Sequence, residues 1–186
     1  MEITTTYKPA NRDQWRDWLH QYHSTKDEIW LLLDNSSNGP KMSYLDAVEE
    51  AICFGWIDGI QKRFSADELA QRFTPRKKRG NWTELNKERA RRLIRLGLMT
   101  DAGRLTLPAL TIESIVAGDI EEALKSESEA WDNFLAFPPL YRRVRIGYIE
   151  EMRGNCGEFE RRLRNFVKKT AANQMFGNWN DGGRLA

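Results

Sequence analysis

A chain of 186 residues is long enough for one domain, or for a domain followed by a small second module. Apolar residues make up 40% and charged residues 30%, and the mean hydropathy is −0.67, so the composition is that of a globular protein rather than of a disordered or membrane protein. The net charge of +2 is too small to indicate a class of partner by itself.

The N-terminus and the cysteines favour a cytoplasmic protein. No basic patch followed by an apolar run opens the chain, so we expect no secretory signal. No stretch reaches the roughly 18 apolar residues that span a bilayer, so we expect no membrane span. Cys53 and Cys156 lie far apart without CxxC spacing, so we expect both to be reduced, buried thiols.

The sequence predicts neither a cofactor nor a metal. The chain contains no GxGxxG, GxxxxGK[ST], HExxH or GxSxG motif. His20 and His23 are its only histidines, and two histidines without a nearby cysteine or carboxylate cluster are a weak metal signal.

The first predicted elements are a helix and a buried strand. In NRDQWRDWLHQYH, Trp15 and Leu19 recur at helical spacing behind Asn11 or Asp13 as the N-cap. The run EIWLLLD at 28–34 is short, continuous and apolar, which favours a strand over a helix.

A second helix leads into a hairpin. SYLDAVEEAICFG has Ser43 as N-cap and Gly55 in a position that suits a left-handed C-cap. WIDGIQKRF and LAQRFTPRK are strand-like runs joined by a polar turn, which predicts an antiparallel pair. Pro75 indicates an edge strand or a strand end.

The rest of the chain reads as helices. We expect a helix that ends at Gly97, a short helix broken near Pro108, and then an all-helical module. The predicted fold is therefore α+β, with a small antiparallel sheet of about three strands packed with helices. The predicted division is an α+β domain at 1–112, a helical module at 113–176 and a flexible tail at 177–186.

Charge is strongly segregated along the chain. Residues 76–95 hold nine Lys/Arg and two Glu, which gives +7, and residues 113–132 hold seven acids and one Lys, which gives −6. These segments are either separate docking surfaces or solvated helix faces that partly neutralise each other inside the fold.

The hairpin places reactive and charged residues near one another. Strand alternation puts Trp56, Asp58, Ile60 and Phe64 on one face. If Asp58 faces Arg72 or Arg76 across the hairpin, the pair is either a structural salt bridge or part of a wall that binds an anion or a peptide.

Cys53 and Asn86 allow two interpretations each. Cys53 falls at the C-terminal end of its helix, where the dipole raises a thiol pKa, so an inert thiol is favoured over a Cys/His nucleophile. Asn86 falls on the apolar face of its helix, where it bonds a neighbouring backbone or lines a pocket.

Three stretches together resemble the bacteriocin-protection, YdeI/OmpD-associated (OmdA) family. They are SYLDAVEEAICFGWIDG, QRFTPRKKRGNW and NKERARRLIRLGLMTDAG, and the resemblance covers residues 12–104. The C-terminal helices are similar to the module that often follows in this family. The positions that match its motifs are Cys53, Trp56, Asp58, Arg72, Phe73, Thr74, Pro75, Arg76, Trp82 and Asn86, and all of them except Pro75 are our candidate ligand-binding residues.

The resemblance implies a small α+β domain followed by helices, without a known cofactor, and a role in tolerance of bacteriocins or cationic antimicrobial peptides. This chain departs from the family in two places. The loop NSSNGPK at 35–41 holds only Lys41 where the family has several lysines, and Glu158-Phe159 stands where Thr-Arg precedes the family's arginine pair, here Arg161-Arg162.

Three functions are therefore compared. The first is a non-catalytic tolerance protein that binds a small anionic or peptide ligand or a protein partner. The second is an enzyme that uses Asp58 with Cys53 or a histidine, which requires these groups within hydrogen-bond reach in a cleft. The third is nucleic-acid binding through the basic segment 76–95, which we do not expect because no nucleic-acid-binding signature accompanies it.

Overall fold

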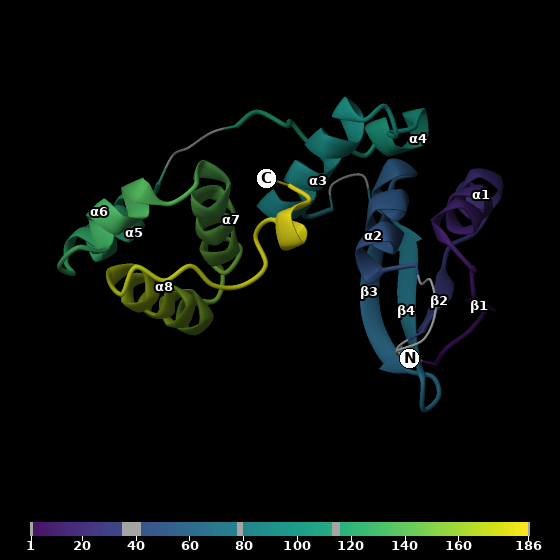
Figure 1. The fold of residues 1–186 in the computed structure, drawn as a ribbon, viewed down its shortest axis with the longest axis horizontal. Coiled ribbons are helices and arrows are strands. Elements are labelled where there is room, and N and C mark those ends of the chain that lie inside the picture. Colours follow the sequence, from purple (N-terminus) through teal and green to yellow (C-terminus); the bar gives the residue numbers. More distant parts are fainter. Residues whose placement is uncertain (1, 35–41, 78–79, 113–115, 186) are drawn as a thin grey trace. The chain divides into compact units, whose positions relative to one another are not determined.

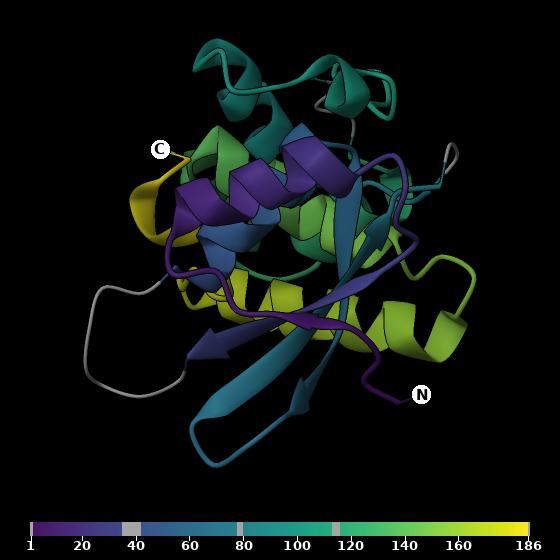
Figure 2. The same cartoon turned by 90° about the vertical axis from the view of Figure 1, so that its right-hand side faces the viewer.

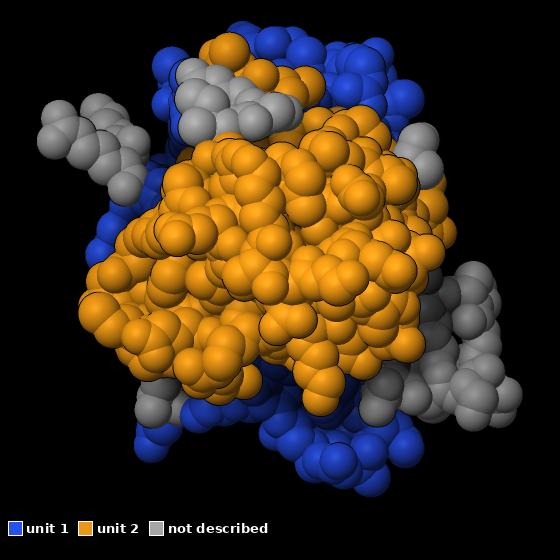
Figure 3. All heavy atoms as spheres, turned by 90° about the vertical axis from the view of Figure 1, so that its left-hand side faces the viewer, with its two compact units in different colours: residues 1–81, 89–109 blue, residues 82–88, 110–186 orange. Residues whose placement is uncertain are grey.

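The computed structural model describes residues 2–34, 42–77, 80–112 and 116–185. The loop predicted at 35–41 lies outside these residues. The chain divides into two compact units, which Figure 3 colours separately. Unit 1 is made of residues 1–81 and 89–109, and unit 2 of residues 82–88 and 110–186.

Unit 1 contains a mixed sheet. Its strands within the described residues are β1 (Thr6–Tyr7), β2 (Ile29–Asp34), β3 (Trp56–Arg63) and β4 (Glu68–Pro75), in the order β1-β2-β4-β3 (Figure 1). The antiparallel hairpin of β3 and β4 is confirmed, and β4 also pairs antiparallel with β2. Pro75 is the last residue of β4, as expected for a proline that cannot donate to the ladder.

The expected number of about three strands is corrected to four. The additional strand is β1, which pairs parallel to β2 through Thr6 opposite Trp30 and Tyr7 opposite Leu31. Two residues are too few to show a strand periodicity, so this strand depends on its neighbour rather than on its own sequence pattern.

The helices α1 (Arg12–Tyr22) and α2 (Tyr44–Cys53) lie side by side in unit 1 (Figure 2). The indole of Trp15 in α1 packs on Phe73 of β4 with ring centroids 5.5 Å apart, and its Nε1 donates to the carbonyl oxygen of Ala47 in α2 at 3.1 Å. Trp18 meets Trp56 of β3 edge-on at 5.7 Å. Aromatic rings therefore hold this helical layer on the sheet.

The predicted helix caps are confirmed. Asn11 accepts a hydrogen bond from the backbone of Gln14, and Ser43 and Asp46 form a reciprocal capping box. After α2, Gly55 has φ +74°, and a Cβ there would lie 2.8 Å from Thr106. Glycine is thus required for both its conformation and its lack of a side chain.

Two further helices complete unit 1. Helix α3 (Glu84–Arg95) begins among the residues of unit 2 and ends among those of unit 1, and the hydroxyl of Thr83 accepts from the backbone of Asn86 at its start. The short helix α4 (Asp101–Arg104) is the part of the predicted broken helix that forms before Pro108.

Unit 2 is helical, as predicted for the C-terminal module. Its elements are α5 (Gly118–Lys125), α6 (Ala130–Ala136), α7 (Pro139–Glu150), α8 (Cys156–Ala171) and the 3-10 turn η1 (Asp181–Gly183). Its core is formed by Ile120, Leu124, Ala130, Phe134, Phe137, Tyr141, Ile146, Ile149, Phe166 and Val167.

The flexibility of residues 177–186 and a domain boundary at residue 112 stay predictions. In the structure Trp179 packs edge-on against Tyr141 at 5.7 Å, and Leu185 is buried. Among the described residues, no helix is long and apolar enough to cross a membrane.

Candidate functional site

The start of β3 brings Asp58 together with Tyr44 and Arg76. The Tyr44 hydroxyl donates to Oδ2 of Asp58 at 2.5 Å. Arg76 follows the end of β4, is buried, and donates through Nη1 to the carbonyl oxygen of Asn81 at 2.9 Å. Burial lowers the pKa of Arg76 to about 10, and the nearby carboxylate of Asp58 partly offsets that shift.

Arg72 has a different partner from the one that the hairpin pattern suggested. In the sheet register Asp58 lies opposite Phe73, so Arg72 belongs to the other face, where it is paired with Trp30. Its Nε donates to Glu28 at 2.7 Å. Hydrogen bonds from Thr4 and from Arg72 lower the pKa of Glu28.

A β-bulge changes the predicted faces of β3. The register shifts between Asp58 and Gln61, and the side-chain Nε2 of Gln71 donates to the freed carbonyl oxygen of Gly59 at 2.8 Å. The extra residue reverses the alternation, so the prediction that Ile60 and Phe64 share a face with Trp56 and Asp58 is wrong. Both side chains are half exposed, at 47% each.

The aromatic candidates belong to the core. Trp56 and Phe73 are 1% and 0% exposed, and Trp56 Nε1 donates to the carbonyl oxygen of His23 at 3.1 Å. Thr74 is partly buried and lies opposite Ile57. Trp56 and Phe73 therefore stabilise the helical layer on the sheet, and a direct contact with a ligand stays a prediction for them.

The thiol of Cys53 is fully buried at the end of α2. Burial and the neighbouring carboxylate of Glu50 raise its pKa to about 12, although the guanidinium of Arg16 opposes the shift. Its backbone carbonyl accepts from both the hydroxyl and the amide of Thr100. A protonated, enclosed thiol is a poor nucleophile.

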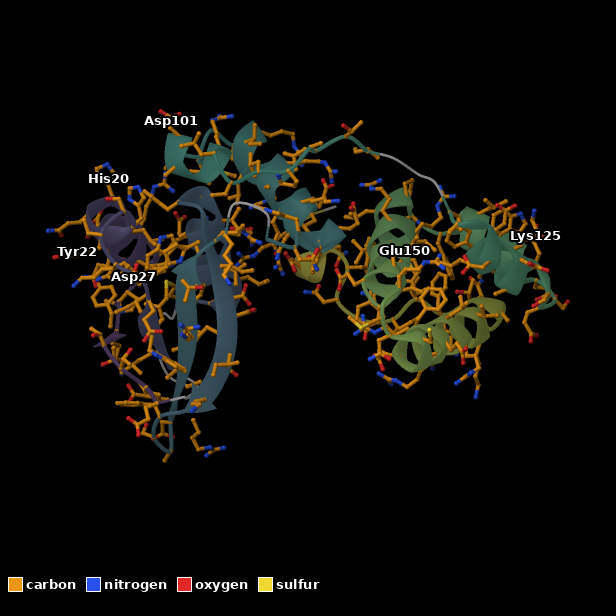
Figure 4. The ribbon with its side chains drawn as sticks, turned by 180° about the vertical axis from the view of Figure 1, so that it is seen from behind. His20, Tyr22, Asp27, Asp101, Lys125 and Glu150 are labelled. Carbon is orange, nitrogen blue, oxygen red and sulfur yellow. The ribbon has the colours of Figure 1, made fainter. Side chains whose placement is uncertain are left out.

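His20, labelled in Figure 4, lies on α1, and His23 is the C-cap residue of that helix. Both imidazoles pack on Phe54, His20 edge-on at 6.3 Å and His23 tilted at 5.5 Å. His23 Nδ1 lies 2.9 Å from the carbonyl oxygen of Leu19. In the part of the chain that the structure describes, no group of three or more His, Cys, Asp or Glu side chains is arranged to hold a metal ion.

Trp82 and Asn86 belong to unit 2, whereas the other candidates belong to unit 1. Trp82 is buried, and Asn86 is part-buried at the start of α3. The structure therefore assembles Asp58, Tyr44 and Arg76 locally, and it separates Arg72 from them.

A buried ion network in unit 1 was not predicted. Its members are Arg12 and Arg16 of α1, Asp46, Glu49 and Glu50 of α2, and Arg92 of α3. Glu49 and Glu50 are 0% and 1% exposed. Two adjacent glutamates on a helix usually indicate a solvated face. The sequence signal for their burial was therefore weak, and consisted only of the apolar residues that flank them in VEEAIC.

The ion network satisfies each buried carboxylate with more than one arginine. Glu50 accepts from Arg12 at 2.5 Å and from Arg16 at 2.6 Å, and Glu49 accepts from Arg12 at 2.9 Å and from Arg92 at 2.8 Å. Each buried glutamate thus has at least two cationic partners, and such pairing is the condition for burying these groups.

Comparison with protein families assigns the two parts of the chain separately. Residues 7–106, more than half of the chain, match a domain of unknown function (DUF8412). The chain belongs to the DUF8412 family. The match spans β1 to α4, including the hairpin, the ion network and the Cys53 thiol.

A second family follows the DUF8412 domain. Residues 113–173 match the family described as bacteriocin-protection, YdeI or OmpD-associated, which confirms the resemblance in the helical module. Residues 12–104, which supplied most of the motifs for that resemblance, lie wholly within the DUF8412 match. No curated protein and no solved structure matches the chain.

Proposed function

We propose that this protein contributes to bacteriocin protection without catalysis, by binding cationic peptides at an acidic face of its helical module. The acidic face consists of Glu122, Glu127, Glu129 and Asp132, at the end of α5 and the start of α6. The observation that carries the proposal is that all four side chains are exposed, within a segment that matches the bacteriocin-protection family.

Two other acids of α5, Asp119 and Glu121, are not counted in the acidic face because each is paired with a cation. Asp119 accepts two hydrogen bonds from Arg153, and Glu121 pairs with Lys125, which is labelled in Figure 4. Among the described residues, the four members of the acidic face form no ion pair. They therefore add four exposed negative charges that no ion pair among the described residues offsets, all between α5 and the first turn of α6.

Such a surface attracts a cationic peptide by long-range electrostatics before any short contact forms. The attraction between exposed charges is screened over roughly 10 Å at 0.1 M salt, so binding of this kind weakens as salt rises.

The geometry in unit 1 supports a non-catalytic function. The enzyme hypothesis needs Asp58 beside Cys53 or a histidine, whereas Asp58 accepts from Tyr44 and the Cys53 thiol is enclosed with a raised pKa. The enclosed Cys53 thiol is therefore not presented as a nucleophile, and the printed side-chain partner of Asp58 is a tyrosine rather than a cysteine or a histidine.

Contacts within the basic segment 76–95 also weaken the nucleic-acid hypothesis. Arg76 and Arg89 are buried, Arg92 pairs with Glu49, and Lys87 pairs with Glu84. Lys78 and Arg79 lie outside the described residues. Cations that already face the protein interior or a carboxylate add little to a surface for phosphates.

Reversal of the acidic face tests the proposal. In Glu122→Lys/Glu127→Lys/Glu129→Lys we expect binding of a cationic bacteriocin peptide to weaken at least tenfold, measured by isothermal titration calorimetry in 50 mM salt. We also expect the same variant to lose protection when it is expressed in a bacteriocin-sensitive bacterium.

The matched control carries three reversals in unit 1, Asp17→Lys, Asp27→Lys and Asp67→Lys, at exposed positions. It has the same net charge as the first variant, and we expect it to bind as the native protein does. Equal losses in both variants would show that net charge alone acts, and unchanged binding in the first would refute a contact at the acidic face.

A further inference from the structure

Unit 2 contains a cavity of about 350 Å³ between α7, α8 and the segment 176–178. Its lining includes three arginines, three aromatic residues and the exposed amides of two asparagines. The residues that matter for its chemistry are Arg145, Tyr148, Arg161, Arg162, Asn165 and Phe176. A volume of this size is at the lower end of the range, roughly 300–1,000 Å³, of small-molecule sites.

Arg145 is the central group of this pocket. Arg145 is 7% exposed, and its Nη2 donates to the carbonyl oxygen of Asn178 at 3.0 Å. Its Nε is buried and has no hydrogen-bond partner among the described residues, and no carboxylate there forms an ion pair with Arg145. A buried guanidinium in this state is costly, because it has lost water without gaining a counter-ion.

The backbone of the C-terminal segment accommodates Arg145 through a glycine. Gly177 has φ +70°, and a Cβ at this position would lie 2.5 Å from Nη1 of Arg145. The guanidinium therefore occupies space that a side chain at position 177 would also need. The contact also shows that the segment after α8 forms a wall of the pocket.

Positive charge is in excess around the pocket. Glu158 accepts from Nε of both Arg161 and Arg162, at 2.8 and 2.7 Å, and so is shared between two cations. Glu151 also acts electrostatically on Arg162. Three arginines therefore face two carboxylates, neither of which lines the pocket or pairs with Arg145.

Aromatic rings bound the same space. The guanidinium carbon of Arg145 lies 5.3 Å from the Tyr148 ring centroid and 5.2 Å from that of Phe176, and Arg162 stacks on Tyr148 at 3.7 Å. These rings offer flat apolar surfaces next to the cation.

We propose that the helical module binds a small organic oxyanion in this pocket, a phosphate or carboxylate group carried on a flat apolar body. The oxyanion would accept from the guanidinium of Arg145, which forms no ion pair among the described residues, and the apolar body would pack against Tyr148 and Phe176. Guanidinium groups suit this ligand because their planar donors match the oxygens of a phosphate or carboxylate. The pocket shares no residue with the acidic face, so this inference is independent of peptide binding.

Calorimetric titration of the full chain with phenyl phosphate, benzoate, inorganic phosphate and uncharged benzamide tests the inference. We expect phenyl phosphate or benzoate to bind at least tenfold more tightly than benzamide, because only the anions supply a counter-ion for the Arg145 guanidinium. If inorganic phosphate binds as tightly as phenyl phosphate, the apolar body of the ligand makes no contribution and that part of the proposal is refuted. If no anion binds, the site itself is refuted.

Three variants locate the binding. Arg145→Lys keeps the charge but removes the planar donors, and we expect at least a tenfold loss of affinity. Asn165→Trp, at an exposed lining position, obstructs the pocket without altering the core. It therefore tests the site even if circular dichroism shows that the Arg145 variant is unfolded. Arg164→Gln is the control, since Arg164 is exposed on α8, pairs with Glu160 and does not line the pocket. Native affinity in Asn165→Trp would refute the assignment.

Discussion

At the level of single residues, the two cysteines of the chain lie in opposite environments. Cys53 is buried beside Glu50 and Arg16, as expected. The expectation of a buried thiol is wrong for Cys156, which is exposed in the first turn of α8. Because the thiolate is the reactive form, a raised pKa and burial both protect Cys53 from alkylation and oxidation.

Thiol titration measures this difference. At pH 8 we expect the folded protein to react rapidly with one equivalent of a thiol reagent, at Cys156, and with a second equivalent only after denaturation. In Cys156→Ser the rapid reaction should disappear, and in Cys53→Ala it should remain. Two rapidly reacting thiols in the native protein would contradict the enclosure of Cys53.

The same thiol makes stability depend on alkaline pH. In the unfolded chain it ionises near pH 8.5, whereas in the folded protein its pKa is about 12. Between these values the unfolded state has released the proton and the folded state retains it, so the stability of the folded state falls as pH rises. Cys53→Ala lacks this contribution, and its stability should fall less steeply above pH 9, by up to about 1.4 kcal/mol per pH unit.

At the level of elements, the junction between α2 and α4 depends on very close backbone contact. Thr100 caps α4 and donates to the carbonyl oxygen of Cys53 at the end of α2. A Cβ at Gly103 would lie 2.2 Å from that oxygen. The short helix can approach α2 only because this position has no side chain.

A methyl group at this junction should therefore separate the two helices. We expect Gly103→Ala to reduce the free energy of unfolding by about 1–3 kcal/mol, the usual cost of overpacking, as measured by urea denaturation. Gly118→Ala is the matched control, because a Cβ at the start of α5 meets open space. A Gly103 variant as stable as the native protein would show that α4 can move without cost.

The hairpin illustrates which features of an element its sequence can predict. Polar residues between two strand-like runs predict the antiparallel pair of β3 and β4, because turn chemistry is local. The bulge after Asp58 is not local, since it depends on the side chain of Gln71 satisfying a carbonyl on the other strand. The partner of Arg72 could not be predicted for the same reason, because one residue of register decides which face it occupies.

At the level of the whole molecule, buried charges join elements that are distant in sequence. The ion network connects α1, α2 and α3 of unit 1 through Glu49 and Glu50. Removing one charge from a buried network leaves its partners without that counter-ion, which costs more than the loss of an exposed ion pair.

Neutralising one buried carboxylate should therefore destabilise the protein strongly. We expect Glu50→Gln to reduce the free energy of unfolding by about 3 kcal/mol, because Arg12 and Arg16 both lose their charged acceptor. Glu122→Gln, at an exposed position of α5, should change it by less than about 0.5 kcal/mol. Equal effects in the two variants, measured by urea denaturation, would show that the network contributes no more than a surface charge.

The class of fold, the helix caps, the hairpin and the helical C-terminal module could be predicted from local sequence, because capping, turn chemistry and apolar periodicity act over a few residues. The sequence also led to the bacteriocin-protection family, which matches the C-terminal module. The tertiary structure alone decided the fourth strand, the partners of Asp58 and Arg72, the burial of Glu49 and Glu50, and the pocket around Arg145. The physical reason is that register, burial and charge pairing depend on groups brought together from distant segments.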